Sequence, residues 1–143
     1  MSRAASAAVD FGALPWQLGV AAALMLIGLA AMSAGVATPR VVVLLALAPL
    51  AEEVVFRAGL HETLLRRLQS PWTANAVTAL TFALAHALLR GDPAALGIVL
   101  PALLIGAVYT RTRRLGPCVG LHAVMNAAWL VWGLAAPWGS VVL

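Results

Sequence analysis

Five long apolar stretches, separated by short polar or Pro- and Gly-containing breaks, constrain the fold of this chain most. They cover about residues 14–37, 41–69, 72–89, 94–109 and 117–135. An α-helix needs roughly 20 apolar residues to cross the hydrocarbon core of a bilayer. Hydrophobic residues make up 63% of the chain and charged residues 10%, whereas soluble domains average about 45–50% and about 25%. The sequence therefore predicts an all-α, polytopic transmembrane helix bundle of about five spans.

The 143 residues suffice for one domain, in which we distinguish three parts. We expect residues 1–40 to form an N-terminal region with one transmembrane helix, residues 41–135 to form a core of four spans, and residues 136–143 to be a short tail. The first apolar stretch is longer than the apolar core of a signal peptide, and its flank is barely basic. We therefore expect the first span to be retained.

The net charge of +4 comes from nine arginines and no lysine. With five spans, Arg40 and Arg90 lie on one side of the membrane. Six other arginines lie on the side of the N-terminus: Arg3, Arg66, Arg67, Arg111, Arg113 and Arg114. The positive-inside rule then predicts a cytoplasmic N-terminus. Arginines that flank apolar spans contact lipid headgroups, so we expect no nucleic-acid partner. The absence of lysine is typical of a GC-rich genome and favours a bacterial inner membrane.

Polar residues inside the apolar stretches form three motifs. These are Glu52-Glu53-x-x-x-Arg57, Phe82-x-x-x-His86 and His122-x-x-x-Asn126. A charged side chain at the centre of a membrane helix costs about 2.5–3.5 kcal/mol on insertion scales. A chain that places several such groups there is expected to use them, and catalysis is the use that we favour.

Helical spacing divides the first motif into two parts. Glu53 and Arg57 are four residues apart, on one face of a helix and in the favourable order for an ion pair. Glu52 points about 100° away from Glu53 and is free to face the bundle interior. Pro49, one turn earlier, lacks a backbone donor and is expected to kink the helix and open space beside Glu52. A buried carboxylate of this kind can act as a general base on water.

The two other motifs supply groups for the hydrolysis of a peptide bond. His86 can polarise the same water and pass a proton to the leaving amine. His122 and Asn126 are four residues apart and project in one direction, so both can donate to the oxyanion of a tetrahedral intermediate. The Ser and Thr residues lie mostly at segment ends, and Cys118 has no evident activating partner. The sequence therefore offers no nucleophilic triad.

Other interpretations of these residues stay open. A charge network that locks the helices together, or a proton relay in a small transporter, also uses intramembrane Glu and His. Zinc is chemically possible on Glu52, His86 and His122, since two His and one Glu form a known catalytic set. His61-Glu62 begins like the HExxH zinc motif, but Leu65 stands in place of its second His. We expect no cofactor and leave a divalent metal open.

The three motifs, in this order on successive apolar stretches, resemble those of the CAAX-protease and bacteriocin-processing (CPBP, or Abi) family. The resemblance covers about residues 41–132, and its members are glutamic-type intramembrane endopeptidases. It implies that Glu52 and His86 activate the water. It also implies that Glu53 and Arg57 support and orient Glu52. His122 and Asn126 would form the oxyanion site.

The resemblance implies a membrane-associated protein or peptide substrate that is cleaved in its C-terminal or membrane-anchored region. Eukaryotic members have more helices than this chain, which has one span before the motif core. Compact bacterial members resemble processing enzymes or bacteriocin-immunity proteins. A non-proteolytic immunity or scaffold protein, and a zinc-dependent variant of the same protease, are therefore the alternatives.

Overall fold

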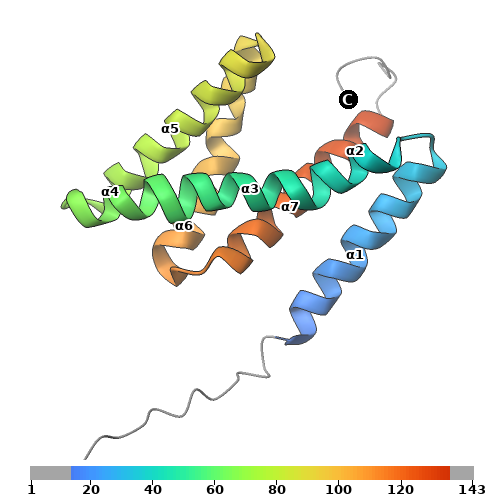
Figure 1. The fold of residues 1–143 in the computed structure, drawn as a ribbon, viewed down its shortest axis with the longest axis horizontal. Helices are drawn as coiled ribbons and strands as arrows, with labels where there is room; N and C mark the ends of the chain where they lie inside the picture. Colours follow the sequence, from blue (N-terminus) through green and yellow to red (C-terminus); the bar gives the residue numbers. More distant parts are fainter. Residues whose placement is uncertain (1–13, 136–143) are drawn as a thin grey trace, which may run out of the picture.

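The computed structural model describes residues 14–135, and within them every regular element is a helix (Figure 1). The elements are α1 (Leu14–Ser33), α2 (Thr38–Val42), η2 (Val43–Leu47), α3 (Ala48–Glu53), η3 (Val54–His61), α4 (Glu62–Arg67), α5 (Pro71–Arg90), η4 (Pro93–Ile98), α6 (Val99–Thr112) and α7 (Leu115–Ala135). The prediction of an all-α fold is confirmed. The expected tail at residues 136–143 lies outside the described residues.

Elements α2 to α4 follow one another without a break and form one long helix over residues 38–67. Two of its segments, η2 and η3, are π-helical, a form that is frequent at functional sites. In η2 the N–H of Ala48 donates to the carbonyl of Val43, five residues back. This wider turn comes directly before Pro49, the residue at which the sequence predicted an irregularity. The second apolar stretch is therefore one helix with a locally widened backbone.

Short polar signals begin and end the helices that follow. The Ser70 hydroxyl accepts a hydrogen bond from the Thr73 N–H at the start of α5. Gly91 ends α5 with φ +64°, a left-handed conformation that glycine adopts without steric cost. The Asp92 carboxylate then accepts from the Ala94 N–H at 2.9 Å and caps η4. Because η4 runs directly into α6, the fourth helical stretch is longer than the predicted one.

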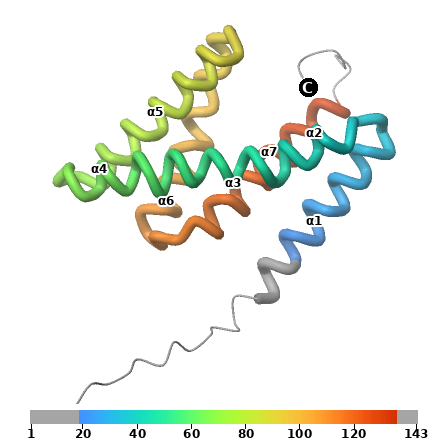
Figure 2. Tube along the Cα trace, viewed as in Figure 1, coloured from blue at the N-terminus to red at the C-terminus, as the bar shows by residue number. Residues whose placement is uncertain are grey.

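The long helix crosses the molecule, with α5 and α6 paired beside one half of it and α1 beside the other (Figures 1 and 2). Helix α7 contacts α1, α3 and α6, so it connects the two halves. The buried clusters between the helices are small. One joins Ala79, Phe82 and Ala102, and another joins Ile105, Tyr109 and Cys118. Alanines at these contacts let helix backbones approach closely, which brings the polar motifs of α3, α5 and α7 within reach of one another.

Three helical stretches are long and apolar enough to cross a membrane, namely 71–90, 93–112 and 115–135. A shorter apolar helix covers 19–33. Large apolar side chains such as Leu84, Leu88, Leu100 and Leu104 are exposed on the outside of the bundle. Such a surface suits lipid rather than water. The chain is a polytopic integral membrane protein.

Candidate active site

Glu53 lies at the centre of a fully buried network. Its Oε2 atom accepts from Arg57 Nε at 2.9 Å, and its Oε1 atom accepts from His122 Nδ1 at 2.8 Å. Arg57 also donates from Nη2 to the carbonyl of Ala102 at 3.1 Å. The ion pair expected from the i, i+4 spacing is thus present. The family resemblance implies that this pair supports Glu52, and in the structure Glu53 also contacts His122 on α7.

The Glu52 carboxylate lies near both His86 and His122. Its Oε2 atom lies 3.7 Å from His86 Nε2 and 3.6 Å from His122 Nε2. This oxygen is buried and has no hydrogen-bond partner in the described part of the chain, although 27% of the side chain is exposed. The distances are too long for direct hydrogen bonds, but a water molecule can bridge groups that are separated in this way. A carboxylate and two imidazoles therefore converge on one position.

The second ring nitrogen of each histidine is already used. His86 Nδ1 lies 3.0 Å from the carbonyl of Phe82, which only accepts, so this nitrogen carries the proton. His122 Nδ1 likewise donates to Glu53. In the neutral rings, both Nε2 atoms therefore present a lone pair toward Glu52. The backbone carbonyl of Phe82, one turn earlier, fixes the orientation of the His86 imidazole.

The Phe82 ring packs against both histidines. Its centroid is 4.3 Å from that of His86 and 5.9 Å from that of His122. Phe56 closes the other side of the ring at 4.9 Å, edge to face. Aromatic packing of this kind restricts rotation of the imidazoles and excludes water from one side of the site.

Asn126 is held by a backbone carbonyl of the long helix. Its Nδ2 atom donates to the carbonyl of Leu44 at 2.9 Å. That carbonyl has lost both possible donors within its own helix. Ala48 donates to Val43 instead, and at the wider spacing the next donor would be Pro49, which has no N–H. The π-helical turn and Pro49 together leave the Leu44 carbonyl free to hold Asn126.

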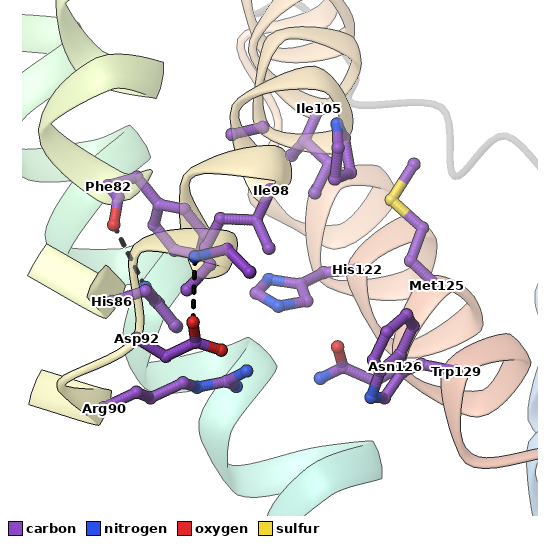
Figure 3. Close-up of a pocket in the computed structure, with 14 residues that line it drawn as sticks. Phe82, His86, Arg90, Asp92, Ile98, Ile105, His122, Met125, Asn126 and Trp129 are labelled. Atoms are coloured by element: carbon purple, nitrogen blue, oxygen red, sulfur yellow. Dashed lines mark hydrogen bonds between the residues drawn. The ribbon is translucent and has the colours of Figure 1, made fainter. Parts of the chain in front are cut away.

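Two cavities flank the histidines. The larger has a volume of about 260 Å³ and lies between α5, η4, α6 and α7. The smaller, of about 90 Å³, reaches Glu52. The residues that line both are His86, Arg90, His122, Asn126 and Trp129. In the larger cavity, His122 and Asn126 extend from α7 toward the side of His86 and Arg90 (Figure 3).

All three motifs fall inside a match to a known family. Residues 34–128 match the family model described as Type II CAAX prenyl endopeptidase Rce1-like. The chain belongs to this Rce1-like family. No curated protein and no solved structure matches it. Family membership confirms the resemblance noted from the motifs and indicates a CAAX-type peptidase that acts on a protein or peptide substrate in a membrane.

Some residues at the site of this Rce1-like protein were not anticipated from the sequence. Arg90 and Trp129 line both cavities, and Asn75 is buried on α5. Helical periodicity is the signal that would have found Asn75, because it precedes Phe82 and His86 by two and three turns on the same stripe. From the sequence, Arg90 was interpreted only as a topology determinant. Its position at a cavity could not be predicted, because it depends on the path of the chain after Gly91.

The remaining histidine, His61, lies apart from the site. It is fully buried against the Tyr109 ring, with 5.4 Å between ring centroids. The neighbouring Glu62 accepts from Arg66 at 3.0 Å and from Arg113 at 2.7 Å. Within residues 14–135, no three His, Cys, Asp or Glu side chains have the arrangement of a metal site. If a metal is bound, Glu52, His86 and His122 are the groups whose donor atoms already face one position.

Proposed function

We propose that this protein is an intramembrane glutamic endopeptidase that uses water activated by Glu52 and His86. The observation that carries the proposal is the convergence of Glu52 Oε2 on His86 Nε2 and His122 Nε2 at 3.7 Å and 3.6 Å. A water molecule at this position has the Glu52 carboxylate and the Nε2 lone pair of neutral His86 to accept its protons. Such groups provide general base catalysis, which contributes about 10²–10⁴-fold to a rate.

The proposed reaction is the addition of water to a peptide carbonyl followed by cleavage of the C–N bond. Glu52 accepts one proton as the water oxygen bonds to the carbonyl carbon. That proton passes through His86 to the amide nitrogen, and the C–N bond breaks to release an amine and a carboxylic acid. The second water proton stays with the acid until it ionises.

The oxyanion of the intermediate forms on the side of His122 and Asn126. Asn126 donates one N–H to the carbonyl of Leu44, and its side-chain amide has a second N–H that can donate to the oxyanion. His122 donates from Nε2 when its ring is protonated, and the Glu53 carboxylate at 2.8 Å stabilises that positive charge. Loss of one oxyanion donor costs about 10²–10³-fold in kcat in enzymes of known mechanism.

The larger cavity suggests the substrate class. Its wall is mainly apolar, with Ile98, Ile105 and Met125 among the lining residues, and Arg90 adds a guanidinium. Within residues 14–135, Arg90 forms no salt bridge. Arginine binds carboxylates well. We propose that the enzyme cleaves near the C-terminus of a membrane-associated protein or peptide, with apolar side chains in the cavity and the terminal carboxylate near Arg90.

The test is cleavage of membrane-anchored peptides by the purified protein in lipid vesicles, followed by mass spectrometry. Glu52→Gln, His86→Ala and His122→Ala are each expected to abolish cleavage and to insert and melt like the wild type. Glu62→Gln, which changes a carboxylate outside the site, is the matched control and should cleave. Cleavage by Glu52→Gln would sink the mechanism. Offering each peptide as a free acid and as an amide tests the role of the carboxylate.

The proposed mechanism requires no metal. Cleavage is expected to continue after dialysis against a chelator, with no stoichiometric metal in the purified protein. Loss of activity on chelation and its return with zinc would instead assign Glu52, His86 and His122 to a metal. Wild-type protein that protects cells from a bacteriocin but cleaves nothing would favour the immunity alternative.

A further inference from the structure

Two polar atoms deep in the bundle have no hydrogen-bond partner among residues 14–135, and they belong to different helices. They are Arg57 Nη1 in η3 and Asn75 Oδ1 in α5. Arg57 has used Nε on Glu53 and Nη2 on a backbone carbonyl. Asn75 has used Nδ2 on the carbonyl of Leu103 at 3.0 Å. An unpaired buried polar group costs about 1–3 kcal/mol. One leftover atom is a donor and the other an acceptor, so each supplies what the other needs.

Both atoms lie beside Gly106 of α6. A methyl group built on Gly106 would overlap the Asn75 side-chain oxygen and come within 3.2 Å of Arg57 Nη1. The two leftover atoms therefore flank one point on the surface of α6. Gly106 is not among the glycines with positive φ, so glycine is needed here for space rather than for its backbone conformation. Any side chain at residue 106 would displace the Asn75 amide.

Arg57 connects this position to the proposed active site. Its guanidinium donates to Glu53 at 2.9 Å, and Glu53 holds His122 at 2.8 Å. His122 in turn faces Glu52. We propose that Asn75 is a positioning residue. Its side-chain oxygen accepts from Arg57 Nη1 through one water molecule and fixes the guanidinium so that Glu53 holds His122 in place. The consequence for catalysis rests on the function proposed above.

The rival explanation is that Asn75 only ties α5 to α6 through the Leu103 carbonyl. A double-mutant cycle separates the two explanations. Arg57→Lys keeps a positive charge for Glu53 and removes Nη1, while Asn75→Leu keeps the volume and removes the acceptor. In the wild-type background, Asn75→Leu is expected to lower kcat by about 10–100-fold, the usual effect of losing such a supporting partner, with KM changed less than about twofold. In the Arg57→Lys background, where Nη1 is already absent, Asn75→Leu should lower kcat less than about twofold.

Equal losses in both backgrounds would overturn the proposal, because they would show that Asn75 acts without Arg57. Wild-type kcat in Asn75→Leu would also overturn it. If Asn75→Leu fails to fold, Gly106→Ala provides the second measurement, since it displaces the same oxygen. It is expected to lower kcat by a similar factor. Gly116→Ala is the matched control, because a methyl group there meets nothing within 4 Å, and it should keep wild-type kcat.

Failure of this inference can be told apart from failure of the proposed function. The four proteins of the double-mutant cycle are the wild type, Arg57→Lys, Asn75→Leu and the double variant. They are also compared by thermal unfolding, which needs no substrate. Groups in contact give non-additive losses of stability, whereas independent groups give additive ones. If the losses of stability are coupled but the wild type has no peptidase activity, the interaction between Asn75 and Arg57 is supported and the proposed endopeptidase function is rejected. Additive losses in an active enzyme would reject the contact alone.

Discussion

Glu53 and Arg57 are fully buried, and each is the main charge partner of the other. When Arg57 is removed, the buried Glu53 carboxylate loses its cationic partner and keeps only the hydrogen bond with His122 at 2.8 Å. We predict that Arg57→Met lowers the free energy of unfolding by about 3–5 kcal/mol. Chemical or thermal unfolding in detergent micelles measures the loss.

Arg66 and Glu62 provide a matched control for this prediction. They are also four residues apart and in the same order, but 76% of the Arg66 side chain is exposed. Glu62 keeps a second partner in Arg113 at 2.7 Å. Arg66→Met should therefore cost less than about 1 kcal/mol. Equal losses in the free energy of unfolding of Arg57→Met and Arg66→Met would mean that burial does not determine how much an ion pair contributes to stability.

The long helix α2–α4 illustrates how backbone irregularity prepares a site at the scale of an element. The π-helical turn η2 directs the Ala48 N–H to Val43, and Pro49 has no N–H, so neither residue donates to the carbonyl of Leu44. The Nδ2 atom of Asn126 in α7 donates a hydrogen bond to this carbonyl at 2.9 Å. The sequence predicted a disturbance at Pro49 that makes space beside Glu52. The structure adds that the same proline provides an acceptor for a residue of another helix.

Pro49→Ala is predicted to weaken this arrangement. The new N–H at position 49 can bond within the helix and competes with Asn126 for the carbonyl of Leu44. Because a misplacement of about 1 Å can cost about 10² in rate, we expect kcat to fall by up to about 100-fold. Pro39→Ala, in the first turn of α2 where an N–H lacks a helical acceptor, should leave kcat unchanged. Steady-state cleavage kinetics decide, and wild-type kcat in Pro49→Ala would refute the link.

At the scale of the whole molecule, the basic loops and the cavities lie at opposite ends of the bundle. Glu62, near the end of the long helix, accepts hydrogen bonds from Arg66 and from Arg113, which follows α6. The two basic loops therefore lie at the same end of the bundle. Arg90 and Asp92, at the other end of α5, line the larger cavity. If the basic end faces the cytoplasm of a bacterial cell, as we propose, the cavity opens toward the outer side of the membrane.

Variants with one added cysteine test this orientation. The native Cys118 is buried and should react little, whereas Arg40 and Arg67 are exposed at opposite ends. In intact spheroplasts, a membrane-impermeant thiol reagent is expected to label Arg40→Cys. Arg67→Cys should be labelled only after the membrane is permeabilised. The reverse pattern would place the cavity on the cytoplasmic side.

The sequence by itself determined the helices, their apolar character and the division of the first motif. Helical periodicity is local, so the spacing of Glu53 and Arg57 was enough to predict their ion pair and to turn Glu52 away from it. Family membership also followed from motif order, and the match over residues 34–128 bears it out.

Only the tertiary structure decided the partners across helices. That Glu53 holds His122, that Leu44 holds Asn126 and that Gly106 brings Asn75 to Arg57 depends on which helix faces meet and how closely. The first two contacts join residues that are 69 and 82 positions apart, and no local spacing in the chain encodes them. Periodicity gives the direction of a side chain from its own helix, but the packing of small residues sets the neighbour that it reaches.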